Sequence, residues 1–142
     1  MSLQFTPFIM LDGHAREAIR FYEEALGAQV VFCQTIGEAP DDAESSLSEE
    51  AKARIAHSVL LIDGAQLFVS DVLPGQKVQP GNLLNICITA DNEQTSRRFY
   101  DALLQGGQVH IPLGPIYFSP AYGMVTDKFG VVFQLFTRRA TE

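Results

Sequence analysis

The sequence predicts an α+β fold built from two copies of one unit, namely a strand, a helix and three further strands. The motif FYEEALGA, which begins at Phe21, returns as FYDALLQGG at Phe99, and an apolar, strand-like run precedes each copy. Residues 58–71 and 124–137 each contain two apolar runs separated by a turn that carries Asp and Gly. Such a repeat indicates the architecture of a chain before any single residue does. We expect the cavity of the fold to lie at or near the junction of the two units.

We expect one domain over residues 1–142, because a chain of 142 residues with 46% hydrophobic composition can bury a single core. Module 1 spans about 1–73 and module 2 about 82–139. An acidic insert interrupts module 1 at about 37–54, and six of its residues before Lys52 are Asp or Glu. The insert is typical of a solvated, mobile loop with a short helical turn, and alternatively of a flap over the mouth of a pocket.

The helix of module 1 is predicted from an apolar stripe that returns every three or four residues. Its members are Ala15, Ala18, Ile19, Tyr22 and Leu26. Asp12 can cap the start of this helix by accepting a hydrogen bond from a free backbone N–H, and Gly27 can supply the left-handed residue at its end. Such a short amphipathic helix is suited to cover one face of a sheet.

The helix of module 2 is predicted to open at Asp91. Gln94 follows three residues later, which is a variant of the capping box. Phe99 and Leu103 are expected on its buried side, and residues 105–107, Gln-Gly-Gly, end it.

Alternation along the strands leaves a second sheet face that mixes polar and apolar side chains. In residues 83–90 the side chains that can pack beneath a helix are Leu84, Ile86 and Ile88, and those that face the other way are Asn85, Cys87 and Thr89. In the last strand, Gln134 shares a face with Val132 and Phe136. In the strand after the first Asp-Gly turn, one face holds Gln66, Phe68 and Ser70. A mixed face of this kind suits a ligand pocket, and it also suits plain exposure to solvent.

The charge and composition argue against several classes of partner. The formal net charge is −7, so nucleic acid and anionic membrane surfaces are disfavoured. No apolar run approaches the roughly 20 residues that span a bilayer, and the N-terminal segment lacks the basic start of a signal peptide. Cys33 and Cys87 lie in apolar, strand-like runs, so we expect buried, reduced thiols in a cytoplasmic protein.

Three segments together resemble the vicinal oxygen chelate (glyoxalase/bleomycin-resistance) superfamily, and within it the PhnB-like subgroup. They are PFIMLDGHAREAIRFYEEALGA, AHSVLLIDGAQLFVSD and HIPLGPIYFSPAYGMVTDKFGVVFQLF. The resemblance covers the chain apart from the acidic insert. It implies that the two modules form a half-open eight-stranded barrel with the helices on the outer face, and it commonly implies a homodimer.

The same resemblance bears on metal binding. Metal-dependent members of the superfamily place one ligand on the first and one on the last strand of each module, and the matching positions here hold Pro7, Phe68, Asn85 and Gln134. Proline and phenylalanine side chains cannot ligate a divalent cation, and amides are weak ligands. We therefore expect no metal and no other cofactor, which disfavours isomerase, dioxygenase and thiol-transfer reactions that use the ion as a Lewis acid. A strand shift of two residues would replace Phe68 by Ser70.

The three histidines have different expected roles. His57 opens a strand, at a position where the PhnB-like pattern also has histidine. It could act as a catalytic general base or bind an anionic ligand, or it could be a structural histidine bonded to the backbone. His110 lies in a strand and is expected to be hydrogen-bonded or exposed. His14 lies in the first turn of a helix and is expected to be exposed.

The sequence gives little support for other kinds of catalysis. No serine lies in a G-x-S-x-G motif, and no glycine-rich loop joins a strand to a helix. Sequences of this subgroup are sometimes labelled methyltransferases of ubiquinone synthesis, but the chain has no glycine-rich turn for the methyl-donor cofactor. Asp71 and Asp127 are expected to be turn-forming carboxylates. Tyr117, Phe118 and Tyr122 form an aromatic segment that could line a binding site or a dimer contact.

Two functions of different class follow. The chain either binds a small organic ligand without catalysis, as metal-free bleomycin-resistance relatives do, or it is an enzyme. Such an enzyme would be of the lyase, isomerase or dioxygenase type and would act on a small organic molecule through His57 and polar groups such as Asn85 and Gln134. The predicted site lies on the sheet face opposite the helices. Its wall is predicted to contain His57, Phe68, Ser70, Asn85, Tyr122 and Gln134.

Overall fold

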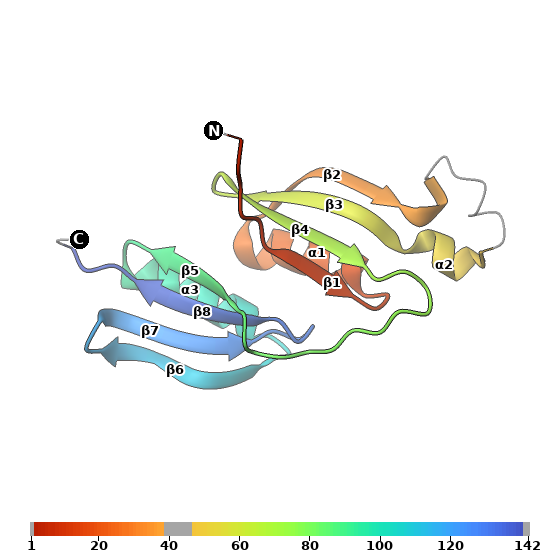
Figure 1. Cartoon of the computed structure of the whole chain (residues 1–142). Coiled ribbons are helices and arrows are strands. Elements are labelled where there is room, and N and C mark those ends of the chain that lie inside the picture. The colour runs from red at the N-terminus through yellow and green to blue at the C-terminus, as the bar shows by residue number, and fades with distance from the viewer. Residues whose placement is uncertain (1, 39–46, 141–142) are drawn as a thin grey trace. The chain divides into compact units, whose positions relative to one another are not determined.

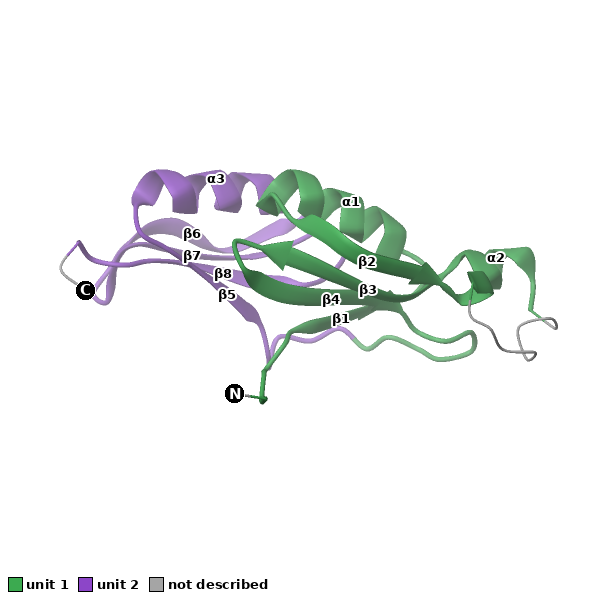
Figure 2. Cartoon of the chain, turned by 90° about the horizontal axis from the view of Figure 1, so that it is seen from above, with its two compact units in different colours: residues 1–79 green, residues 80–142 purple. Residues whose placement is uncertain are grey.

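The computed structural model describes residues 2–38 and 47–140, and the chain divides into two compact units, unit 1 (residues 1–79) and unit 2 (residues 80–142) (Figure 1, Figure 2). Each unit has the order strand, helix and three strands, so the two βαβββ modules predicted from the repeat are confirmed. Each unit forms its own four-stranded mixed sheet, and together they make an α+β fold.

Unit 1 consists of β1 (Phe8–Leu11), α1 (Ala15–Leu26), β2 (Gln29–Thr35), the 3-10 helix η1 (Ile36–Glu38), α2 (Glu49–Ala53), β3 (Ile55–Ile62) and β4 (Ala65–Asp71). The strand order is β1-β4-β3-β2, with β1 parallel to β4 and the other neighbours antiparallel. Helix α1 covers one face of this sheet (Figure 2). The opposite face is called the open face of unit 1.

Unit 2 consists of β5 (Ile86–Ala90), α3 (Glu93–Leu104), β6 (Gln108–Ile116), β7 (Ser119–Thr126) and β8 (Val132–Thr137). The order β5-β8-β7-β6, with β5 parallel to β8, repeats the topology of unit 1. Helix α3 covers one face of this sheet (Figure 2). The opposite face is called the open face of unit 2.

The start of α1 differs from the prediction. Asp12 does not cap the helix but forms an ion pair with Arg54 at 2.8 Å. Asp71, at the end of β4, takes the capping role: its Oδ1 accepts from the backbone N–H groups of Gly13 at 2.8 Å and Ala15 at 3.0 Å. Its Oδ2 accepts from the Ile55 N–H at 3.0 Å, so this buried carboxylate joins α1, β3 and β4 and does more than form a turn. A side chain that is distant in sequence has replaced the local cap.

The end of α1 and its buried stripe agree with the prediction. All five predicted stripe residues are buried, and Gly27 has the left-handed conformation, with φ of 68°. In unit 2 the cap of α3 lies one residue later than predicted. Asn92, and not Asp91, accepts from the Thr95 N–H at 2.8 Å. Phe99 is only half-buried, because Ser96, Tyr100 and Leu103 form the side that faces the sheet.

Contacts at the ends of β4 and β8 show which side chains face the helices. Asp71 bonds the start of α1, and the Thr137 hydroxyl lies 2.6 Å from that of Ser96 in α3. Because side chains alternate along a strand, the residues at even spacing from these two also face the helices. They are the buried Leu67, Val69, Phe133 and Leu135. The side chains between them, Phe68, Ser70, Gln134 and Phe136, belong to the open faces.

The first strand of module 2 starts later than predicted. β5 begins at Ile86, and the preceding Leu84 is 89% exposed, so it does not pack beneath the helix. Ile86 and Ile88 are half-buried, and Cys87 and Thr89 lie on the other face of the strand, as predicted. Leu84 lies in the connection before the strand, where no strand pairing holds its side chain against α3.

The two cysteines are free and exposed, so the prediction of buried thiols is wrong. Cys33 lies on β2 and Cys87 on β5, and each of these strands is the last one at an edge of its sheet. An edge strand has a neighbour on one side only, so an apolar run there is covered less than in a central strand.

The acidic insert is described only at its two ends, as η1 and α2. The predicted helical turn is present as α2, whose cap Ser48 accepts from the Ala51 N–H at 3.1 Å. Arg54, which follows α2, donates to Asp12 and to the Val72 carbonyl at 3.1 Å. Residues 39–46 lie outside the described part of the chain, so the flap stays a prediction.

Among the described residues, no helix is both long enough and apolar enough to cross a membrane.

Candidate functional site

The open face of unit 2 carries a chain of three hydrogen-bonded polar side chains. Gln134, on β8, donates from Nε2 to Asn85 Oδ1 at 2.7 Å, and its Oε1 accepts from the Tyr122 hydroxyl. The sheet topology brings them together, because β8 lies between β5 and β7. Directly opposite Gln134 are Cys87 on β5 and Met124 on β7. Gln134 therefore lies at the centre of this face.

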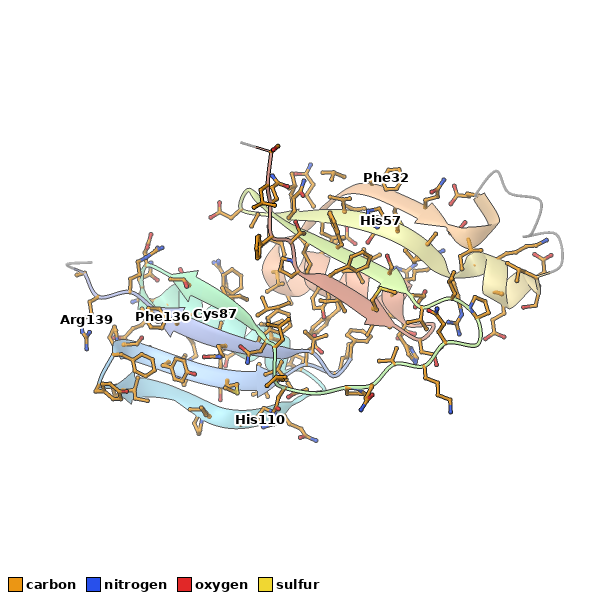
Figure 3. All side chains as sticks on the ribbon, viewed as in Figure 1. Phe32, His57, Cys87, His110, Phe136 and Arg139 are labelled. Atoms are coloured by element: carbon orange, nitrogen blue, oxygen red, sulfur yellow. The ribbon has the colours of Figure 1, made fainter. Side chains whose placement is uncertain are left out.

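Three aromatic rings stand beside this polar chain. The rings of Phe118 and Tyr122 meet edge to face, with centroids 5.0 Å apart, and Phe118 stacks on Phe136 at 6.0 Å with only 8° between the ring planes. Tyr117 extends the group with an edge contact to Phe118 at 5.1 Å, although it is largely exposed. Figure 3 shows Phe136 and Cys87 on the neighbouring strands β8 and β5. The rings of Tyr117, Phe118 and Phe136 are called the aromatic wall, and they adjoin the polar chain at Tyr122.

Tyr122 is held in its neutral form. Burial raises the pKa of its phenol above the ordinary value of 10.0, and the nearby Cys87 thiol adds to the rise, because a thiolate beside a phenolate would repel it. A neutral phenol keeps its proton and can donate a hydrogen bond to Gln134 Oε1. The hydrogen-bond chain is therefore intact at neutral pH.

We predict that alkaline titration will reveal this shift. Because the pKa of Tyr122 is higher in the folded chain than the ordinary value, the stability that depends on its neutral form is present below pH 10 and is lost as pH rises through the raised pKa. Absorbance at 295 nm, compared between the native chain and Tyr122→Phe, should show one tyrosine that ionises above pH 10. A difference curve centred at or below pH 10 would contradict the prediction.

No formally charged side chain occupies the strand positions of this face in the part of unit 2 that the structure describes. The positions on β5, β8 and β7 are Cys87, Thr89, Val132, Gln134, Phe136, Tyr122, Met124 and Thr126. His110 on β6, the nearest titratable imidazole on these strands, is hydrogen-bonded to the Thr126 hydroxyl. These strand positions are polar at the centre, aromatic at one end and free of Asp, Glu, Lys and Arg, and the guanidinium of Arg139, which follows β8, donates to the Tyr117 carbonyl beside the aromatic end.

The open face of unit 1 is aromatic around His57. The imidazole contacts Phe68 edge to face at 4.9 Å, and the rings of Phe8 and Phe32 lie 5.8 and 6.1 Å away. Figure 3 shows Phe32 and His57 on the neighbouring strands β2 and β3. His57 is half-buried and forms no hydrogen bond with the described residues, so the alternative of a backbone-bonded structural histidine is not what the structure shows.

Ser70 lies on the same face of β4 as Phe68 and is opposite Met10 of β1. It is almost fully buried, and its hydroxyl has no hydrogen-bond partner in the described structure. A buried hydroxyl without a partner costs free energy, so it marks a place where a polar partner would be favourable.

The remaining candidates have structural roles. His110 is exposed and bonded to Thr126, as predicted, and His14 is exposed beside Glu17 at 3.5 Å. Asp127 forms the predicted turn: its Oδ1 accepts from the N–H groups of Phe129 at 2.9 Å and Val131 at 3.0 Å.

The six predicted site residues fall into two groups, one in each unit. His57, Phe68 and Ser70 share the open face of unit 1, and Asn85, Tyr122 and Gln134 are joined on that of unit 2. That all six line one pocket stays a prediction. Sequence reasoning gave no site role to the ring of Phe136 or to Cys87. Strand alternation had placed both on the correct faces, but their closeness to Tyr122 and Gln134 depends on strand register.

The donor set does not fit the divalent cation that the superfamily resemblance implies. Pro7 offers only its carbonyl, which already accepts from the Phe68 N–H at 3.0 Å. The side-chain oxygens of Asn85 and Gln134 each already accept a hydrogen bond. No group of three or more His, Cys, Asp or Glu side chains is placed to hold a metal among the described residues. Neutral amides alone are poor ligands for zinc, iron or manganese.

We therefore predict a metal-poor protein. Elemental analysis of the chain, purified without chelator and dialysed, should find well under one equivalent of Zn, Ni, Fe or Mn. Stoichiometric metal that survives dialysis would contradict this prediction and revive a Lewis-acid reaction.

The architecture and this site can be compared with known proteins. A family model described as 3-demethylubiquinone-9 3-methyltransferase matches residues 3–136. The chain belongs to this family, which is PhnB-like. The crystal structure of protein PA1353 from Pseudomonas aeruginosa is similar, with 30% identity, a TM-score of 0.85, and coverage of 96% of this chain and 98% of that one.

Two further structures extend the comparison. A PhnB protein from Bacillus cereus, described as a putative 3-demethylubiquinone-9 3-methyltransferase, is 22% identical with a TM-score of 0.77 and covers 95% of this chain and 99% of its own. The fosfomycin resistance protein FosX from Listeria monocytogenes is 13% identical with a TM-score of 0.64, covering 96% of this chain and 92% of that one. The FosX in this structure is a point mutant, and it was crystallised with Mn(II) and a dihydroxypropylphosphonic acid. These likenesses confirm the glyoxalase-like fold.

Proposed function

We propose that the chain is a small-molecule-binding protein whose ligand lies on the open face of unit 2 and needs no divalent metal there. The hydrogen-bonded chain of Asn85, Gln134 and Tyr122 carries this proposal. Ligand sites combine apolar and aromatic walls with a few oriented polar groups, and Phe118 and Phe136 supply such a wall. The fold supports the idea in general terms, since FosX holds a small organic acid, but a fold does not decide a function.

The methyltransferase activity in the family description is not part of the proposal. A nucleoside cofactor is usually held at a glycine-rich turn between a strand and a helix. The connection from β1 to α1 holds a single glycine, Gly13, and the connection from β5 to α3 holds none. Neither connection provides such a cradle.

A fragment screen tests the proposed function. Ligand-observed NMR with a library of small aromatic amides, ketones, acids and amines should give binders whose signals depend on Gln134. The variant Gln134→Leu removes both hydrogen bonds while keeping a similar side-chain volume. It should therefore lower the affinity for those binders at least about 10-fold. Gln94→Leu makes the same exchange on exposed α3 and should leave binding unchanged. If binders of the native chain are equally well bound by Gln134→Leu, the hydrogen-bonded chain is only structural.

The free imidazole of His57 favours a second candidate, an enzyme in which this histidine is the general base. A half-buried imidazole without a hydrogen-bond partner among the described residues can accept a proton from a substrate. In that case His57→Gln would abolish turnover of a substrate and keep its binding. Turnover that survives this change would exclude His57 as the base.

Assembly into a homodimer is a further proposal. Val31 and Phe32 are half-exposed on edge strand β2, and exposed apolar edges are commonly covered by a partner. Light scattering should therefore give about twice the chain mass of 15.6 kDa. A monomer that persists at micromolar concentration would contradict it.

A further inference from the structure

The hydrogen-bonded chain on the open face of unit 2 has a direction. The Tyr122 hydroxyl donates to Gln134 Oε1, which leaves Gln134 Nε2 to donate to Asn85 Oδ1. A neutral phenol is a good donor, and Tyr122, whose pKa lies above the ordinary 10.0, is neutral at pH 7. Two donors remain in this chain: the second N–H of Gln134 Nε2 and the Nδ2 group of Asn85, which has no hydrogen-bond partner in the described structure. This face therefore offers an N–H donor to a ligand.

The strand positions around Asn85 and Gln134 offer no counter-ion, and the guanidinium of Arg139 lies beyond them, at the Tyr117 carbonyl. The strand positions of this face on β5, β8 and β7 hold neutral side chains only. Moving a charged group from water onto a half-buried surface costs free energy unless an opposite charge meets it there. A charged ligand group placed beside Asn85 and Gln134 would lose hydration without gaining an ion pair, so these positions select against both signs of charge.

The aromatic rings limit how a ligand can stack. Phe118 and Phe136 are nearly parallel, with centroids 6.0 Å apart. A third ring between them would need about 7 Å, which is twice the contact distance of carbon atoms. A ligand ring must therefore lie against the wall and not between these two rings. That arrangement suits a flat molecule that has one face against the aromatic wall and the other face away from it.

From these three observations we propose that the ligand of this face is a neutral, flat molecule with a carbonyl group that accepts a hydrogen bond from Asn85, such as an aryl amide or aryl ketone. This inference rests on the proposed function and adds the chemical class of its ligand. The carbonyl meets the free Nδ2 group, and the flat ring lies on the aromatic wall beside Tyr122.

A matched series of probes tests the class. 2-Naphthamide is neutral, 2-naphthoate is its anionic analogue and 2-naphthamidine its cationic analogue, and all three share one ring system. Titration calorimetry on the full chain at pH 7 should show 2-naphthamide binding at least about 10-fold more tightly than either ion. Equal or tighter binding of an ion would overturn the inference, while the proposed function would stand.

The variant Asn85→Asp separates the donor from the rest of the site. Aspartate keeps the oxygen that accepts from Gln134 but lacks the Nδ2 donor and adds a charge. We expect Asn85→Asp to weaken the binding of 2-naphthamide at least about 5-fold. We also expect it to bind 2-naphthamidine more tightly than the other two probes. Asn82→Asp adds the same charge in the exposed connection before β5 and should keep the native preference.

Unchanged binding of 2-naphthamide by Asn85→Asp overturns the inference. If no probe binds although the fragment screen finds Gln134-dependent binders, the class is wrong and the proposed function stands. If neither experiment finds a binder, both fail.

Discussion

Gly107→Ala should destabilise unit 2 more than any other glycine-to-alanine exchange in the described chain. Gly107 lies between the end of α3 and the start of β6, where a Cβ atom would sit 2.0 Å from the Thr126 carbonyl oxygen and 3.0 Å from the Asp127 Cα. Both obstacles are backbone atoms, so they can yield only if β7 or the turn after it moves. We expect a loss of about 3 kcal/mol in the free energy of unfolding, at the upper end for overpacking.

Gly114→Ala is the matched control, because it makes the same exchange in β6 at a position where a Cβ atom meets nothing within 4 Å. Urea unfolding followed by circular dichroism should place this variant close to the native chain. Similar stability of Gly107→Ala and the native chain would show that α3 and β7 are not packed as described.

Asp71→Asn should be the most damaging of the conservative side-chain changes in unit 1. The buried carboxylate accepts three backbone hydrogen bonds, from Gly13, Ala15 and Ile55. Asparagine has the same shape but turns one acceptor into an N–H donor, which would face one of these backbone N–H groups. Losing a hydrogen bond to a charged group and leaving a buried donor without a partner should cost about 2–4 kcal/mol.

Asp63→Asn makes the same exchange in the exposed turn between β3 and β4. Asp63 has φ of 48°, a conformation that asparagine also tolerates, so its stability should change little. Urea unfolding of the two variants side by side measures the contrast. If Asp71→Asn unfolds at the same urea concentration as Asp63→Asn, Asp71 does not hold α1, β3 and β4 together.

The sequence was sufficient to predict the fold because the repeat, the apolar periodicity and the turn glycines all act locally. It could not place the cap of α1, because Asp71 lies 56 residues from Ala15 in sequence. Local reasoning chose Asp12, whose carboxylate pairs with Arg54 instead. Helix caps are predictable from neighbouring residues only when no distant side chain competes for the same N–H groups.

The same distinction applies to the candidate site. Alternation placed Gln134 and Asn85 away from the helices, but it could not show that they bond to each other or that Tyr122 completes the chain. Those contacts depend on β8 lying between β5 and β7, and on the register that sets Cys87 and Met124 opposite Gln134. The exposure of both cysteines has a similar origin, since only the strand order makes β2 and β5 edge strands.

Chemical-shift mapping tests most directly whether the open face of unit 2 binds a ligand. ¹⁵N–¹H spectra of the labelled full chain should be recorded while 2-naphthamide, or the tightest binder of the fragment screen, is added. We expect the side-chain amide signals of Asn85 and Gln134, and the backbone signals of β5, β7 and β8, to shift together with one affinity. Saturable binding that leaves these signals in place and shifts signals elsewhere would contradict this expectation.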